Sequence, residues 1–210
     1  MMAQDPRVAV IDYGAGNLRS VVRAIQHLGY EARVTDQPQV VLDAPAIILP
    51  GVGAAGEAMA SLERLGLAAA IKRAVAGGKP FLGVCLGLQL LFTSTDEGGG
   101  YPCLGLMAGR VRKLPPGLKV PHMGWNQVRL VRPLPIFQDV PDGSNFYFVH
   151  SYYADPEDGR VVAGQTEYGV DFASIVARDN IVAAQFHPEK SGDVGLRVYR
   201  NFLACALPQV

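Results

Sequence analysis

Cys85 stands between two glycines in the most apolar part of the chain, within FLGVCLGLQLLF (81–92). The residues before it predict a buried strand over 80–85, and LGLQLLFTS (86–94) is typical of the start of a helix. The pattern G-x-C-x-G at such a turn is the thiol form of the nucleophile elbow, in which Gly83 and Gly87 remove Cβ atoms that would clash. The helix N-terminus favours a thiolate there, and its free N–H groups can stabilise an oxyanion. A small apolar cysteine of the core is the alternative interpretation.

A thiol nucleophile needs a general base, and the chain has four histidines. We expect His27 at the surface near the end of a helix, His122 in a loop without an acid beside it, and His150 in or just after a strand. His187 differs, because it follows the apolar strand IVAAQF (181–186) and begins an H-P-E sequence that ends at Glu189. A carboxylate two residues beyond a histidine can accept its ring N–H and hold one tautomer. Taken alone, the same pattern also fits a solvated loop histidine.

Composition excludes several classes of function. The 210 residues are 49% hydrophobic and 18% charged with a formal net charge of zero, so neither a nucleic-acid-binding stripe nor a polybasic membrane segment is expected. The first residues, MMAQDPRVAVID, lack the pattern of a signal peptide, and the apolar run around Cys85 is too short to span a membrane. The cysteines are odd in number and form no CxxC pair, so we expect no disulfide framework and no metal site. We expect a cytoplasmic protein with a single domain over residues 1–210.

Strands and helices alternate in the first half of the chain. Strands are predicted at four places, 7–12, 31–36, 46–51 and 80–85. Helices are predicted over 17–30, where Gly29 is a suitable C-cap, and over 56–76. This order favours a mostly parallel sheet with helices on both faces.

The second half of the chain has a different pattern. Six strand-like segments follow one another with short connections, at 109–114, 126–132, 145–153, 160–167, 172–179 and 181–186. We therefore expect an additional antiparallel strand region. The chain ends in an amphipathic helix over 193–207, whose expected apolar side consists of Leu196, Tyr199, Phe202, Leu203 and Ala206.

A glycine-rich turn follows the first predicted strand, in DYGAGNLRS (12–20). Such a turn suggests dinucleotide binding, but the pattern G-x-G-x-x-G requires glycine at the position of Arg19, and no acidic strand end supports a ribose site. We therefore expect no nucleotide and no other cofactor.

The G-x-C-x-G elbow together with the late H-P-E sequence resembles the class I glutamine amidotransferases over essentially the whole chain. The resemblance implies their fold, a flavodoxin-like, mostly parallel central sheet with helices on both faces and added antiparallel strands. It implies that Cys85 attacks the side-chain amide carbon of glutamine, that His187 protonates the departing ammonia, and that Glu189 orients His187.

The same resemblance assigns the surroundings of the triad. It implies an oxyanion loop at Gly51, Val52 and Gly53, with Leu86 beside it, where the alternative is an ordinary turn after the strand. It also implies a glutamine-binding pocket formed by Gly53, Leu86, Gln89, His150 and Ser151. Gln89 lies four residues after Cys85 and can therefore face the same cleft, although a surface or capping role is the alternative.

Four stretches resemble one branch of the family, the glutaminase subunits of imidazole glycerol phosphate synthase: DYGAGNLRS, VPHMGWN (120–126), FYFVHSYY (146–153) and FHPEKS (186–191). That branch passes ammonia to a separate cyclase subunit, a (β/α)₈ barrel, in a heterodimer of histidine biosynthesis. The resemblance places Trp125, Asn126, Tyr147 and Lys190 at the interface. From the residues alone, Trp125 could be a core aromatic, whereas the flanking Met123-Gly124 and Asn126-Gln127 favour a surface turn. Lys190 could be a solvated charge.

Three alternatives remain open at this point. A sibling glutaminase of another pathway shares the chemistry but should lack PHMGWN. A different thiol hydrolase of the same fold needs neither DYGAGN nor the H-P-E-K-S string. A catalytically silent binding subunit would show a broken triad, and the triad positions are intact.

Overall fold

A parallel sheet forms one half of the computed structural model, which describes residues 7–14 and 17–207. Its strands lie in the order β2 (Ala32–Thr35), β1 (Val8–Ile11), β3 (Ile47–Gly51), β4 (Phe81–Cys85) and β13 (Ile181–Ala184). Every residue of β1, β3 and β4 is buried. Uninterrupted apolar strands of this kind are expected where both faces of a parallel sheet are covered.

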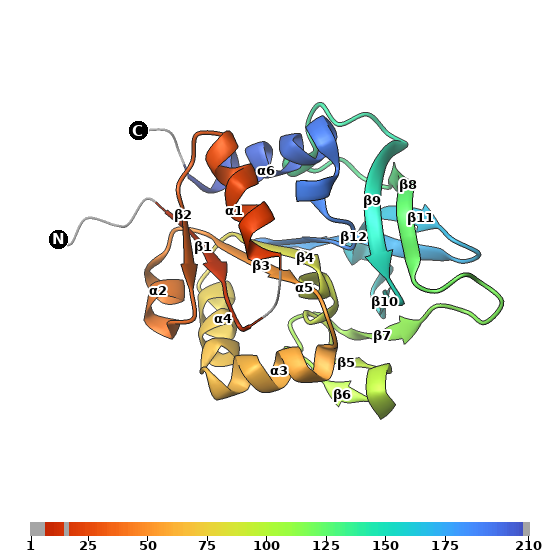
Figure 1. The fold of residues 1–210 in the computed structure, drawn as a ribbon, viewed down its shortest axis with the longest axis horizontal. Helices are drawn as coiled ribbons and strands as arrows, with labels where there is room; N and C mark the ends of the chain where they lie inside the picture. Colours follow the sequence, from red (N-terminus) through yellow and green to blue (C-terminus); the bar gives the residue numbers. More distant parts are fainter. Residues whose placement is uncertain (1–6, 15–16, 208–210) are drawn as a thin grey trace.

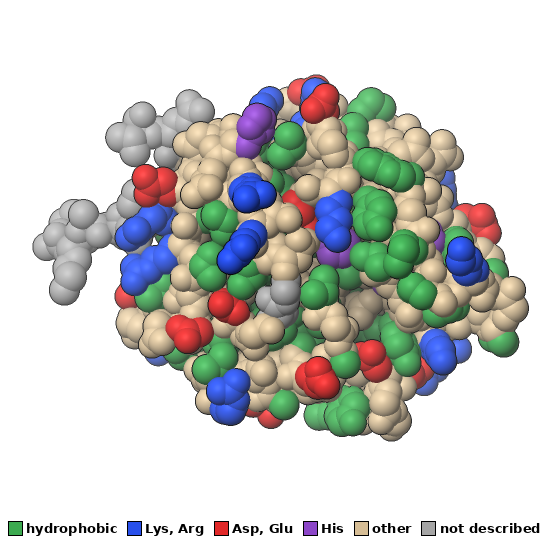
Figure 2. Space-filling view, in the orientation of Figure 1, with side chains coloured by type: hydrophobic (Ala, Val, Ile, Leu, Met, Phe, Trp, Pro, Cys, Tyr) green, Lys and Arg blue, Asp and Glu red, His purple; other side chains and the backbone are tan. Residues whose placement is uncertain are grey.

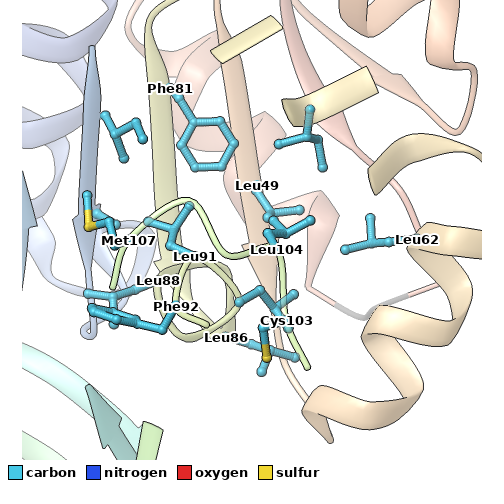
Figure 3. Packing of buried hydrophobic residues seen from close by; sticks show 14 of the residues in the cluster. Leu49, Leu62, Phe81, Leu86, Leu88, Leu91, Phe92, Cys103, Leu104 and Met107 are labelled. Atoms are coloured by element: carbon cyan, nitrogen blue, oxygen red, sulfur yellow. The ribbon is translucent and has the colours of Figure 1, made fainter. Parts of the chain in front are cut away.

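Helices cover both faces of this sheet (Figure 1). The helices are α1 (Leu18–His27), α2 (Pro38–Asp43), α3 (Ala55–Arg64), α4 (Leu67–Ala76), the short α5 (Leu86–Gln89) and α6 (Gly192–Ala206). Successive residues of β3 point to opposite faces, so Leu49 packs in a core beneath α3 and α4, while Ile48 packs in a second core beneath α1 and α6. Figure 3 shows part of the first core, where Leu62 of α3 faces side chains of the strands and of the segment after α5.

The chain beyond α5 extends the sheet, mostly by antiparallel pairing. From β13 the sheet continues through β12 (Asp171–Arg178), β10 (Tyr152–Pro156), β7 (Gly109–Lys113), β5 (Ser94–Thr95) and β6 (Tyr101–Pro102). A branch leaves β12 through β11 (Val162–Glu167) to β8 (His122–Leu130) and β9 (Ser144–His150). Single-turn 3₁₀ helices occur at Glu97–Gly99, Pro135–Phe137, Gly159–Val161 and Pro188–Lys190. The predicted mixture of parallel and antiparallel strands is confirmed.

Strand β8 corrects two sequence expectations, because His122 does not lie in a loop and Trp125 does not lie in a turn. Both belong to β8, which pairs in register with β9, His122 opposite His150 and Trp125 opposite Tyr147. The predicted strand over 145–153 divides at Ser151, where the chain passes from β9 into β10.

Two helical expectations also change. The region 56–76 is two helices, because Gly66 has φ 71 and interrupts the helical backbone between α3 and α4. The helix expected after Cys85 ends at Gln89. The next carbonyls accept N–H groups from a returning segment, with Leu104 N–H bound to Leu90 O and Met107 N–H bound to Leu91 O, so they are not available to continue a helix. The short elements α2, β5 and β6 were not predicted, since they are too short to show a period.

The remaining helical predictions hold. Helix α1 ends at His27, which is exposed, and Gly29 follows it with φ 83. Helix α6 buries Tyr199, Phe202 and Leu203 against the second core. None of the helices among the described residues is long and apolar enough to cross a membrane.

The turn from β4 into α5 has the strained geometry of a nucleophile elbow. Cys85 has φ 54 and ψ −107, which a non-glycine residue rarely adopts. A Cβ on Gly87 would lie 1.8 Å from the Leu49 carbonyl oxygen, and one on Gly83 would lie 2.8 Å from the Gly87 carbonyl oxygen. The two glycines are therefore required by close backbone approach, as the sequence pattern predicts.

Replacing Gly87 with alanine should destabilise the fold by about 3 kcal/mol or more, because the new Cβ would overlap a backbone oxygen that cannot move aside easily. Gly159→Ala is the matched control, because its Cβ would meet nothing within 4 Å, and it should change stability by less than about 0.5 kcal/mol. Denaturant unfolding of both variants measures the difference. Equal unfolding midpoints for the two variants would contradict the close approach at the elbow.

Candidate active site

The Cys85 sulfur is enclosed at the carboxyl end of β4. The residue is only 5% exposed, and its thiol lies 3.8 Å from the Val149 carbonyl oxygen, to which the S–H can donate. The side-chain amide of Gln185 lies 3.7 Å from the sulfur on another side and donates an N–H to it. The sulfur is thus held between one acceptor and one donor.

The register between β4 and β13 brings the candidate base to this sulfur. Val84 lies opposite Ala184 in the parallel pair, so the chain just beyond β13 runs alongside Cys85. His187 lies there with Nδ1 2.8 Å from a carboxylate oxygen of Glu189, and both side chains are almost fully buried. Its Nε2 is buried and makes no hydrogen bond with any described residue, so that nitrogen is available to take or give a proton.

Negative charge on the Cys85 sulfur and on Glu189 would stabilise an imidazolium at His187 after it takes a proton. Burial lowers the pKa of His187, but the charge and hydrogen bonding of a Cys85 thiolate and of the Glu189 carboxylate outweigh burial and raise the pKa to about 10. A cysteine, a histidine and a carboxylate in this order form a nucleophile, base and orienting group.

The Glu189 carboxylate is itself held in place by two further side chains. Asn17 donates its amide N–H to one oxygen at 2.6 Å, and Tyr199 donates its hydroxyl to the other at 3.3 Å. Burial raises the pKa of Tyr199 well above its ordinary value, so this phenol stays a donor. The carboxylate therefore has one fixed orientation toward His187.

A cavity of about 240 Å³ opens beside Cys85. It is lined by all five residues predicted for glutamine binding, Gly53, Leu86, Gln89, His150 and Ser151, together with Val52, Glu97, Pro121, Val149 and Tyr152. A larger cavity of about 620 Å³ lies near the start of β4 and β13, where it touches Pro80 and Asn180, and none of the predicted site residues lines it. Sites of α/β sheets lie at the carboxyl ends of the strands, which favours the smaller cavity.

The predicted oxyanion loop is only partly at the cavity. Val52, Gly53 and Leu86 line it, but Gly51 does not. Gly51 is the last residue of β3, and a Cβ there would lie 2.1 Å from the Tyr13 hydroxyl. Close packing beside the site therefore explains why a glycine occupies position 51.

Gln89 is buried, which excludes the surface role considered from sequence. One amide N–H binds the Tyr152 carbonyl oxygen at 2.8 Å, and the other binds the Gln185 side-chain oxygen at 3.1 Å. The Tyr152 carbonyl oxygen also accepts Nδ1–H of His150 at 2.9 Å. One backbone carbonyl thus fixes two pocket side chains.

His122 and His150 form a buried pair below the pocket. His122 Nδ1 lies 2.8 Å from His150 Nε2, and because His150 Nδ1 donates to Tyr152, His122 must be the donor of this bond. Asn126 then donates to His122 Nε2 at 3.2 Å. Burial lowers the pKa of His122 to about 4 and that of His150 to about 3, so both rings are neutral at pH 7.

The four residues predicted for a partner interface lie on or beside β8 and β9. Trp125 is 58% exposed, which excludes a core role, and its ring packs edge-on against Tyr147 at 6.2 Å. The Lys190 ammonium lies 5.5 Å from the Tyr147 ring centre, within reach of a cation–π interaction. Asn126 is partly buried and also binds the Glu167 carbonyl oxygen. Figure 2 shows hydrophobic side chains gathered on this side of the molecule.

Comparison with known proteins connects this geometry with a family. The family model "Glutamine amidotransferase class-I" matches residues 9–205. The chain belongs to the class I glutamine amidotransferase family. The predicted family and its fold are therefore confirmed.

Individual amidotransferases are similar over nearly the full length of the chain. Imidazole glycerol phosphate synthase subunit HisH of Dehalococcoides mccartyi (strain CBDB1) is 52% identical over 200 residues, covering 95% of this chain and 98% of that protein. The subunit of the same name from Moorella thermoacetica is 54% identical over 195 residues, covering 93% of each chain. The solved structure of PurLQS from Thermotoga maritima has a TM-score of 0.75 at 22% identity, covering 95% of this chain and 98% of that one, and shares the fold.

Several residues of the candidate site were not found from sequence. Gln185 is in the predicted strand over 181–186, two positions before His187, so strand periodicity could have placed it on the same side as His187, but its amide suggested no role. Tyr199 was predicted only as a buried helix residue, and Asn17 only as part of DYGAGNLRS. Ala15 and Gly16 of that stretch, like residues 1–6, lie outside the described residues. Among the described residues, no group of three or more potential ligands could hold a metal ion.

The neutral histidine pair predicts a loss of stability in acid. The folded pKa values of His122 and His150 lie below the value of about 6.5 expected in the unfolded chain, so the unfolded chain binds more protons as pH falls. Stability from this pair is complete above about pH 6.5 and should fall below it, by up to about 1.4 kcal/mol per pH unit for each histidine. The contribution of His187 to stability has the opposite pH dependence. Its raised pKa gives stability that is complete below about pH 6.5 and is lost as pH rises through about 10.

Urea unfolding of the wild type and of His122→Gln between pH 5 and 8 tests this pair. The variant should show a smaller decrease in stability between pH 6.5 and 5, because one of the two titrating rings is absent. An unchanged slope in the variant would mean that His122 is not held neutral.

Proposed function

We propose that this chain is the glutaminase subunit of imidazole glycerol phosphate synthase, hydrolysing glutamine to glutamate and ammonia in histidine biosynthesis. The observation that carries the proposal is the enclosed Cys85 thiol next to a buried His187–Glu189 pair in a chain about half identical to HisH subunits. The proposal treats residues 1–210 as one amidotransferase domain acting in the cytoplasm.

The reaction begins with proton transfer from the Cys85 thiol to Nε2 of His187. The sulfur attacks the side-chain amide carbon of glutamine, and negative charge moves onto the amide oxygen. Backbone N–H groups of Leu86, Val52 and Gly53, which line the cavity, are the candidate donors to this oxyanion. His187 then gives its proton to the leaving nitrogen, ammonia departs, and a thioester to Cys85 remains.

Hydrolysis of the thioester completes the cycle. Water gives a proton to His187 Nε2 while its oxygen attacks the thioester carbon. Collapse of this second tetrahedral intermediate breaks the carbon–sulfur bond, and the proton returns from His187 to the sulfur. Glutamate leaves, and Glu189 holds the imidazole in one orientation throughout, through the 2.8 Å contact to Nδ1.

The cavity supports an amino-acid substrate. Its volume of about 240 Å³ suits one small molecule, and Gln89, His150 and Ser151 offer polar groups at its wall. Both N–H groups of Gln89 are already used, so its carbonyl oxygen remains as an acceptor for N–H groups of glutamine.

Ammonia must be protected from water, where it is protonated at neutral pH and stops being a nucleophile. A docked cyclase subunit, a (β/α)₈ barrel in a heterodimer with this chain, would give it a sheltered route. The surface formed by Met123, Trp125, Tyr147 and Lys190 is the proposed docking face, since Met123 and Trp125 are 62% and 58% exposed. Strand β9 joins this face to the pocket, because Tyr147 is followed by Val149, His150 and Ser151 at the cavity.

Cys85→Ala should reduce glutamate release from glutamine by at least about 10³-fold, because no other group can form the thioester. Cyclase binding should survive, since Cys85 is buried away from the docking face. Cys205→Ala is the control, as Cys205 is exposed and lines only the larger cavity. Persistent glutaminase activity in Cys85→Ala would refute the assignment of the nucleophile.

Trp125→Ala should weaken cyclase binding about 10- to 100-fold, because an exposed aromatic side chain at an interface centre commonly contributes this much. Val34→Ala on the distant strand β2 removes a similarly exposed apolar group and should leave affinity unchanged. Titration calorimetry with the cyclase measures both. Equal affinities for the two variants would move the interface away from β8.

A further inference from the structure

Gln185 contacts the Cys85 sulfur directly. It is completely buried just beyond β13, next to Ala184, which pairs with Val84 of β4. Cys85 is the next residue after Val84, and its strained backbone at the elbow turns its side chain out of the strand alternation. The amide nitrogen is 3.7 Å from the sulfur.

Gln185 is the donor in this hydrogen bond, and this follows from the hydrogen bonds that link Gln185 through Gln89 to the Tyr152 backbone carbonyl. The Tyr152 carbonyl can only accept, so the Gln89 group that faces it at 2.8 Å is the NH₂. The second N–H of Gln89 then faces Gln185, which must present its side-chain oxygen, at 3.1 Å. Gln185 is left with its NH₂ toward Cys85, so the sulfur is the acceptor.

The Val149 carbonyl lies on another side of the sulfur and has the opposite effect. It accepts from the neutral thiol at 3.8 Å but offers nothing to a thiolate. His187 takes the proton and its imidazolium then stands beside the thiolate, while Gln185 is a second donor that already contacts the sulfur before the proton moves. Hydrogen bonds to an ionised acceptor are about twice as strong as those to a neutral one, so this contact gains strength as charge develops.

We propose that Gln185 is a catalytic residue, whose side-chain amide donates a hydrogen bond to the Cys85 sulfur and stabilises it as a thiolate, and that Gln89 is the positioning residue that orients this amide. The inference rests on the proposed function in one respect, that Cys85 is the nucleophile. In the step concerned, the thiol proton passes to Nε2 of His187, the electron pair stays on sulfur, and Gln185 keeps both of its protons.

Two variants of Gln185 separate the effect of losing the N–H donor from the effect of changing the shape of the side chain. Q185M keeps the length of the side chain but cannot donate, and Q185E keeps its outline but places an oxygen toward the sulfur. Ser174→Ala is the matched control, because Ser174 is also fully buried on the neighbouring strand β12 and its hydroxyl makes no hydrogen bond with a described residue.

The first readout is the rate of Cys85 alkylation by iodoacetamide at pH 7, resolved from Cys205 by peptide mass spectrometry. Loss of one charge-assisted hydrogen bond should slow alkylation about tenfold in Q185M, and further in Q185E. Ser174→Ala should stay within about twofold of the wild type. Circular dichroism establishes folding, and if Q185M does not fold, Q185E carries the same comparison.

The second readout is the cyclase-activated glutaminase rate. Q185M should lower kcat with little change in KM, because Gln185 does not line the cavity that would hold glutamine. Unchanged alkylation and kcat in folded Q185M and Q185E would overturn the proposal. A wild type without glutaminase activity would instead refute the proposed function, while the alkylation comparison would still decide whether Gln185 stabilises the thiolate.

Discussion

The parallel pairing of β4 with β13 brings together two segments about a hundred residues apart in the chain. Cys85 ends one strand, and Gln185 and His187 follow the other, so the proposed nucleophile, its proposed hydrogen-bond donor and its proposed base depend on one register. A shift of one residue would turn these side chains to the opposite face of the sheet. The uninterrupted apolar character of both strands, buried between two cores, stabilises this register.

Polar groups are confined to the carboxyl ends of these strands, and nearly all of them have fixed partners. Asn17 and Tyr199 hold Glu189, Glu189 holds His187, and the Tyr152 carbonyl holds Gln89 and His150. Two groups beside the thiol lack a partner among the described residues, Nε2 of His187 and the Tyr13 hydroxyl. In His187, an Nε2 without a hydrogen-bond partner is what proton transfer requires.

Most of the fold, and the residues of the proposed triad, could be picked out from sequence, and the reasons are local. Parallel strands read as apolar runs, and the elbow and the H-P-E sequence each depend on spacing of a few residues. Strand β8 could not be predicted over its first half, because Met123 and Trp125 point to solvent while His122 is buried, which inverts the usual alternation. Such an inversion is expected where a surface is built to meet a partner and not water.

Contacts between distant segments were the part that sequence could not supply. Gln185, Asn17 and Tyr199 have ordinary sequence contexts and acquire their roles only when the sheet and α6 bring them to Cys85 and Glu189. The early end of α5 has the same cause, since its stop depends on hydrogen bonds from a segment more than ten residues later.

Glutamate release from glutamine by this chain alone, with the cyclase subunit, and with the cyclase and its ribotide substrate tests the central claim most directly. On the proposed function, with the proposed docking face joined to the pocket through β9, we expect a low rate alone and a large rise in the third condition. No activity in any of the three conditions, with the protein folded and Cys85 reduced, would contradict the assignment of this site as a glutaminase that serves the cyclase.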